Sequence, residues 1–115
     1  MEYLFICEFG KKRSVKAAEI ANEISRRNKL NINASYCGMG DLEDNLSSIK
    51  LDKYDRIIVM EDYMKEILNK KYKVRLSIIE SLDILEFPGI SLSLTTNSLI
   101  ESKVREMLNL NEVLK

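Results

Sequence analysis

Histidine is absent from this chain of 115 residues, and cysteine occurs only twice, as Cys7 and Cys37. The lack of histidine excludes histidine-ligated metal sites, serine–histidine triads and histidine acids or bases. Two cysteines are too few for a disulfide scaffold or a four-cysteine zinc site. Acid–base chemistry is left to aspartate, glutamate, cysteine, lysine or tyrosine. The sequence therefore predicts neither a metal nor a cofactor.

An excess of charge of one sign is also lacking, because 18 basic and 18 acidic residues give a formal net charge of zero. A neutral chain has no overall electrostatic attraction for nucleic acid or for an anionic membrane. No apolar run has the length of a transmembrane helix, and the opening residues, MEYLFIC, lack the features of a signal peptide. We expect a cytoplasmic protein, monomeric or weakly dimeric, that binds neither nucleic acid nor membrane.

The order of apolar patterns along the chain predicts the class of fold. Hydrophobic residues make up 45% and charged residues 31% of the chain, a balance typical of a folded globular domain. Runs typical of buried strands alternate with amphipathic helical patterns, which predicts a parallel sheet with helices on both faces. The predicted strands are 3–7, 30–37 and 56–60, and the predicted helices are 14–27, 41–49, 61–70 and 99–110.

The segment between residues 74 and 94 is open to three interpretations. It could hold a strand at 74–79, a strand at 81–85, or a helix that leads into a strand at 90–94. Beyond it, Ser98 and Glu101 have the spacing of a capping box, which predicts that the last helix begins directly after Ser98.

The most specific feature is FICEFGKKRSVKAAE, residues 5 to 19, where a buried strand ends at Cys7 and a helix begins near Ser14. In a parallel sheet, ligands bind beyond the carboxyl ends of the strands. Backbone N–H groups of a tight loop and a helix N-terminus bind anions there, and Arg13 adds a planar fork for two phosphate oxygens. An inert buried cysteine beside a solvated basic turn is the alternative. The combined spacing favours a nucleophilic thiol aimed at a bound oxyanion.

The stretch CEFGKKRS matches the C-x5-R-S phosphate-binding loop of the low-molecular-weight protein tyrosine phosphatases, and most of the chain resembles that family. YLFIC is similar to the first strand of the family, DRIIVMEDYMKEIL (55–68) to its third strand and following helix, and SLDILEF (81–87) to its fourth strand and acidic loop. The resemblance implies one α/β domain over residues 1–115. The expected fold is a three-layer sandwich, with a four-stranded parallel sheet of order 2-1-3-4 covered by helices on both faces.

The resemblance also implies an activity, the hydrolysis of phosphotyrosine in a protein or of a small aryl phosphate ester through a phosphocysteine intermediate. By position, Cys7 is the nucleophile, Arg13 stabilises the transferring phosphoryl group, and Ser14 hydrogen-bonds the sulfur of Cys7 and favours the thiolate. The phosphate oxygens would be wrapped by the backbone of Glu8, Phe9, Gly10, Lys11, Lys12 and Arg13.

The general acid of such a mechanism has two candidates in this chain. Aligning SLDILEF places Glu86 at the acidic position of the family and Phe87 where an aromatic side chain flanks the substrate ring, while Asp83 is the competitor. Either carboxylate could instead be a plain surface group. The loop also departs from the family, with Gly10 in place of an asparagine and Glu8 placing a negative charge directly after the nucleophile.

Cys37 ends the second predicted strand, at the same edge of the sheet as Cys7. A reversible disulfide between them could protect the nucleophile from over-oxidation, and a buried structural thiol is the alternative. Two other functions stay open. One is a phosphocarrier resembling the IIB subunits of sugar phosphotransferase systems, whose C-x-x-G start Cys7 and Gly10 also satisfy, although those proteins lack the equivalent of Arg13. The other is a catalytically weak domain that only binds an anion.

Overall fold

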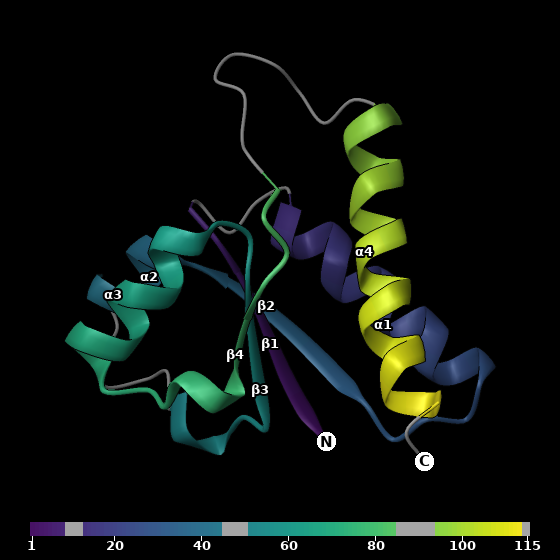
Figure 1. Cartoon of the computed structure of the whole chain (residues 1–115), viewed down its shortest axis with the longest axis horizontal. Helices are drawn as coiled ribbons and strands as arrows, with labels where there is room; N and C mark the ends of the chain where they lie inside the picture. The colour runs from purple at the N-terminus through teal and green to yellow at the C-terminus, as the bar shows by residue number, and fades with distance from the viewer. Residues whose placement is uncertain (9–12, 45–50, 85–93, 114–115) are drawn as a thin grey trace.

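A four-stranded sheet lies at the centre of the protein in a computed structural model that describes residues 1–8, 13–44, 51–84 and 94–113 (Figure 1). All its strand pairs are parallel, and the order of the strands is β2-β1-β3-β4. The α/β class and the predicted order 2-1-3-4 are therefore confirmed. The strands are β1 (Glu2–Cys7), β2 (Asn33–Gly38), β3 (Arg56–Val59) and β4 (Ile79–Ser81).

Helices cover both faces of the sheet, which confirms the three-layer arrangement. In Figure 1, α1 (Arg13–Arg27) and α4 (Leu94–Val113) lie together on one side of the strands, and α2 (Met39–Asp44) and α3 (Asp62–Tyr72) lie on the other. Two short 3-10 turns, η1 (Leu51–Lys53) and η2 (Leu76–Ile78), precede β3 and β4. Of the helices in the described part of the chain, none has the length and apolar character needed to cross a membrane.

The central strand β1 is buried on both sides, as its continuous apolar run predicts. Because side chains alternate along a strand, Phe5 and Cys7 pack on the face covered by α1 and α4. Leu4 and Ile6 pack on the face covered by α2 and α3. The side chain of Cys7 therefore lies on the same face of the sheet as α1.

Helix α1 follows its predicted pattern and holds the edge strand β2. Its apolar stripe, which includes Ile20 and Ile24, is buried against the sheet. The side-chain amide of Asn22 donates to the carbonyl of Ala34 at 3.0 Å and accepts from the N–H of Ala34 at 2.8 Å. This pair of bonds fixes the helix that carries Arg13 and Ser14 relative to the sheet.

Three predictions about secondary structure need correction. Helix α4 begins at Leu94, so Ser98 is an exposed residue inside it, and the predicted capping box is wrong. The fourth strand is a three-residue segment, Ile79–Ser81, which overlaps the ends of both proposed strands. Helix α2 (Met39–Asp44) begins before the predicted start at Asp41, and residues 45–49 of that prediction lie outside the described part of the chain. Of the proposed strand at 90–94, Leu94 is helical and the other residues lie outside the described part of the chain.

Candidate active site

Backbone hydrogen bonds continue past the carboxyl ends of β1, β3 and β4, at one edge of the sheet. The N–H of Met60 donates to the carbonyl of Ile6 at 3.1 Å, which extends the pairing past the end of β3. In the same way, Leu82 donates to Val59 at 2.9 Å and Ile84 donates to Met60 at 2.7 Å. Residues that directly follow the strands therefore keep defined positions, and this is the edge at which ligands of parallel sheets bind.

Cys7 ends β1 at this edge, and its sulfur lies 3.0 Å from the hydroxyl oxygen of Ser14 in the first turn of α1. Cys7 is only 3% exposed and Ser14 is fully buried. When the sulfur is a thiolate, the hydroxyl of Ser14 can only donate to it, and such a bond stabilises the charged, nucleophilic form. The structure thus brings together two of the residues that the sequence singled out.

Arg13 connects the start of α1 with the ends of the two following strands. Its guanidinium is buried, with Nη1 donating to the carbonyl of Ile84 and Nη2 lying 3.3 Å from Oε2 of Glu61. Glu61 lies two residues after the end of β3, and its side chain is 17% exposed. A buried arginine held by a carboxylate and a carbonyl has a fixed plane, which is what recognition of two phosphate oxygens requires.

Glu61 is the residue of this site that sequence reasoning missed. Its partner Arg13 is 48 residues away in the chain, so no local pattern joins them. A signal was present in VME, because the glutamate follows a buried strand that pairs directly with β1. Any charged residue that follows a neighbouring parallel strand deserves testing as a partner for Arg13.

Asp83 lies beside this network but is an exposed residue. Its backbone has a positive φ of 53°, in the left-handed region that aspartate tolerates better than most residues, and its N–H donates to the hydroxyl of Ser81 at 3.2 Å. The next residue, Ile84, supplies the carbonyl that Arg13 binds. The segment SLDILEF, which contains both candidate acids, therefore contacts Arg13 directly through Ile84.

Of the other residues predicted for the phosphate-binding loop and its acidic segment, Glu8 lies in the described part of the chain and the rest lie outside it. Glu8 is exposed, and its carbonyl accepts from the N–H of Met39 at 3.2 Å, which ties the end of β1 to the start of α2. Within the described residues, no three Cys, Asp or Glu side chains gather as a metal site would need. The predicted residues that lie outside the described part of the chain are Phe9, Gly10, Lys11, Lys12, Glu86 and Phe87.

The proposed disulfide between Cys7 and Cys37 does not fit the observed arrangement. Both side chains are buried thiols, and both strands end at the same edge, as predicted. However, Cys37 pairs in register with Ile6 and packs with Leu4 and Ile6 on the face covered by α2 and α3. Cys7 packs on the opposite face. The two side chains therefore lie on opposite faces of the sheet.

Comparisons with known proteins agree with this geometry at the level of the fold. A scan against models of protein families finds no match, and neither does a search of curated proteins. Among solved structures, the chain is similar to a mutant of YwlE from Bacillus subtilis, with a TM-score of 0.79, 17% identity, and coverage of 97% of this chain and 99% of that one. A low-molecular-weight protein tyrosine phosphatase from T. tengcongensis gives a TM-score of 0.78 at 17% identity, covering 95% and 98%.

A third similar structure is a cysteine-to-serine mutant of the YwlE arginine phosphatase with a phosphorylated active site serine. It has a TM-score of 0.80 and 16% identity, and the match covers 97% of this chain and 96% of that one. Identities this low establish the fold alone. The chain has the fold of the low-molecular-weight protein tyrosine phosphatases.

Proposed function

We propose that this protein is a cysteine-dependent phosphatase that hydrolyses a phosphorylated protein side chain or a small phosphate ester. The observation that carries the proposal is the contact of 3.0 Å between Cys7 Sγ and Ser14 Oγ, together with the buried guanidinium of Arg13, the residue directly before Ser14. A thiol with a hydroxyl donor and an adjacent fixed arginine is the equipment for attack on a bound phosphoryl group. An inert structural cysteine needs neither neighbour.

The first chemical step would transfer the phosphoryl group to the protein. The thiolate of Cys7 attacks phosphorus, so an S–P bond forms while the P–O bond to the leaving group breaks. Arg13 stabilises the negative charge on the equatorial oxygens, and a protonated carboxyl group gives its proton to the leaving oxygen. Asp83 and Glu86 are the candidates for that carboxyl group.

The second step would regenerate the enzyme. The carboxylate left by the first step takes a proton from water, whose oxygen attacks phosphorus. The S–P bond breaks, inorganic phosphate leaves, and Cys7 returns to the thiolate that Ser14 stabilises. No oxidant or reductant takes part, so the chain's own residues suffice for both steps.

The substrate is proposed to be phosphotyrosine or an aryl phosphate, by the resemblance of the C-x5-R-S loop. A second candidate is phosphoarginine, because the similar structures include YwlE arginine phosphatases. These two side chains differ in the bond that breaks, which is P–O in phosphotyrosine and P–N in phosphoarginine. A pair of peptides that differ only in the phosphorylated residue distinguishes the two candidates.

The proposal is tested by hydrolysis of para-nitrophenyl phosphate by the wild type, Cys7→Ser and Arg13→Ala between about pH 5 and pH 8. We expect turnover by the wild type only. Cys7→Ser should still fold, because serine is close to cysteine in size, and it is expected to accept a phosphoryl group without releasing it. Stable phosphorylation of wild-type Cys7 with no hydrolysis would favour the phosphocarrier. Absence of both would leave only an anion-binding domain.

A further inference from the structure

The end of α3 and the segment after it concentrate positive charge in a chain that is neutral overall. Residues 67–79 contain no acidic residue and four exposed cations, Lys70, Lys71, Lys73 and Arg75, which we call the basic end. Lys70 and Lys71 lie in the last turn of α3, where cations commonly stabilise the helix dipole. Lys73 and Arg75 lie beyond the helix, so the dipole does not account for them.

Lys73 occupies a backbone position that suits glycine better than lysine. It caps α3 with φ 61° and ψ 29°, in the left-handed region, and its N–H donates to the carbonyl of Leu68. Glycine is preferred there because a Cβ atom is strained in this conformation. Lys70, Lys73 and Arg75 have no carboxylate partner within the described part of the chain. The charge of Lys73 therefore has no evident role in holding the fold together.

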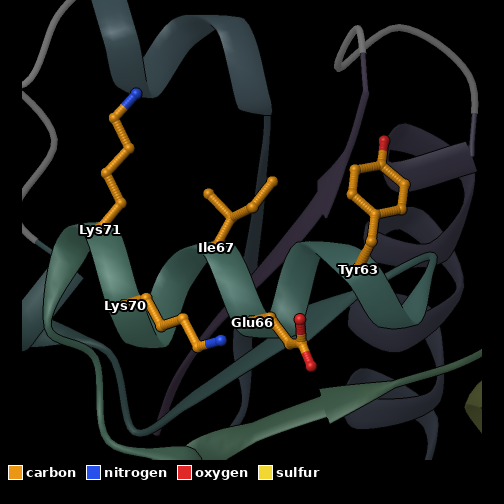
Figure 2. Close-up of a pocket in the computed structure, with 5 residues that line it drawn as sticks. All are labelled: Tyr63, Glu66, Ile67, Lys70 and Lys71. Carbon is orange, nitrogen blue, oxygen red and sulfur yellow. The ribbon is translucent and has the colours of Figure 1, made fainter.

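Two hollows adjoin the basic end. The larger, of about 410 Å³, lies along the exposed side of α3 and is shown in Figure 2, where Tyr63, Ile67 and Lys71 project together from one side of the helix. We call it the α3 groove, and its lining residues are Tyr63, Glu66, Ile67, Lys70 and Lys71. The smaller hollow, of about 170 Å³, is lined by Leu51, Asp52, Tyr54, Tyr72, Lys73, Val74, Arg75 and Ile78.

The smaller hollow is itself part of the basic end. Tyr72, Lys73 and Arg75 all line it. A carboxylate is the group that the two cations would attract there.

The α3 groove lies along a helix that begins beside the candidate active site and ends at the basic end. Helix α3 begins directly after Glu61, the partner of Arg13, so Tyr63 lies near the edge of the sheet that carries Cys7. The helix has 11 residues and a length of about 16 Å, and its last turn lies toward the opposite edge. About five residues of an extended peptide span that length.

We propose that α3 docks an acidic segment of a protein substrate, with its carboxylates on the basic end and the chain between lying in the α3 groove. This proposal rests on the proposed phosphatase function and names its substrate class, a phosphoprotein with acidic residues about five positions from the phosphorylated side chain. Four cations on a neutral chain form a small field, which suits a short peptide better than a nucleic acid. Hollows that accept single side chains also suit a peptide better than a flat membrane surface.

The test compares two phosphopeptides that differ only in the distal residues, three glutamates in one and three glutamines in the other. We expect the acidic peptide to have a KM roughly tenfold lower at low salt, with kcat unchanged, since three exposed charge contacts give about that difference. The triple variant Lys70→Gln, Lys73→Gly, Arg75→Gln should remove the advantage. Its turnover of para-nitrophenyl phosphate, which cannot reach the basic end, should match that of the wild type.

Lys29 provides a matched control for Lys73. Both are exposed lysines with positive φ near the end of a helix, Lys29 two residues after α1 and Lys73 directly after α3. Lys29→Gly and Lys73→Gly each remove one charge and relieve the same strain, so both should raise the melting temperature. Only Lys73→Gly should raise the KM of the acidic peptide. Equal effects of the two variants on KM would overturn the docking surface.

Failure of the docking proposal can be told apart from failure of the proposed function. Binding of the unphosphorylated acidic peptide, followed by fluorescence anisotropy, needs no catalysis, and we expect Lys73→Gly to weaken it. Equal KM values for the two phosphopeptides, with hydrolysis still dependent on Cys7, would overturn the docking proposal alone. Loss of all hydrolysis would instead overturn the phosphatase. Tighter binding to anionic vesicles or to single-stranded nucleic acid than to the acidic peptide would also overturn the proposal.

Discussion

Replacement of Glu61 by glutamine is expected to impair catalysis through Arg13, the residue that its carboxylate contacts. The carboxylate lies 3.3 Å from Nη2 of Arg13, and the two side chains are 17% and 2% exposed. The charge attraction at that distance is about 5 kcal/mol at an effective dielectric of 20, and desolvation cancels much of it. A charge-assisted hydrogen bond of this kind retains a net value of about 2 kcal/mol. If that energy positions Arg13, its loss lowers kcat/KM roughly 30-fold.

The assay for Glu61 combines turnover with anion binding. We expect Glu61→Gln to lower kcat/KM for para-nitrophenyl phosphate and to raise the inhibition constant of inorganic phosphate, because Arg13 loses the carboxylate that helps to hold its guanidinium. Glu61→Asp retains the charge but withdraws the carboxylate, so it should show the same two changes. Glu66→Gln is the matched control, because Glu66 is an exposed glutamate in the middle of α3, and it should behave like the wild type.

Two results would refute the reasoning about Glu61. A kcat/KM within about twofold of the wild type, in a variant with an unchanged melting temperature, would show that Arg13 needs no such partner. Tighter inhibition by phosphate would show that the carboxylate opposes the anion by its charge instead of positioning the guanidinium. A thermal unfolding curve of each variant keeps loss of fold apart from both results.

Ser14→Ala should lower kcat roughly tenfold, because it removes the hydroxyl 3.0 Å from Cys7 Sγ, and full activity at saturating substrate would contradict that role. Asp83→Asn and Glu86→Gln should be compared on phenyl phosphate, whose poor leaving group must be protonated by the general acid. Only loss of the true acid should slow this reaction, and unchanged rates for both would place the acid outside residues 81–87. Cys37→Ala should leave inactivation of Cys7 by peroxide unchanged, because the two thiols pack on opposite faces of the sheet. An intramolecular disulfide detected by intact mass would contradict that arrangement.

The first strand and its following helix could be predicted from the sequence because their signals are local. The apolar run before Cys7 is buried on both faces, and the spacing of Ile20 and Ile24 defines one face of α1. The contact between Cys7 and Ser14 then follows, because the short connection keeps the first turn of the helix close to the end of the strand. The resemblance supplied the pairing in advance, and the fold places it at the expected edge.

The errors have different physical causes. At Ser98, a local capping pattern predicted a helix start, yet α4 already begins at Leu94. A capping sequence is only a weak preference, which the rest of the fold can override. The strand β4 was hard to delimit because only three residues pair, so its apolar pattern is too short to have a period. For both features, the deciding interactions come from distant parts of the chain.

The face of the sheet on which Cys37 packs was predictable in principle. Side chains alternate along strands, and parallel partners in register share a face, so the pairing of Cys37 with Ile6 separates it from Cys7. The sequence did not define the register of β2, because the imperfect alternation from residue 30 to 37 fits more than one register. For the Glu61–Arg13 pair, the sequence VME marks Glu61 only as a candidate partner, because the pair itself depends on how β3 aligns with β1.

The central claim, that Cys7 carries the phosphoryl group during turnover, is tested most directly by rapid-quench mass spectrometry of the wild type mixed with para-nitrophenyl phosphate. The account predicts one added phosphoryl group on the peptide that contains Cys7, formed and lost at rates compatible with turnover, and no modification or hydrolysis in Cys7→Ala. Hydrolysis that proceeds while Cys7 stays unmodified, or that persists in Cys7→Ala, would contradict it.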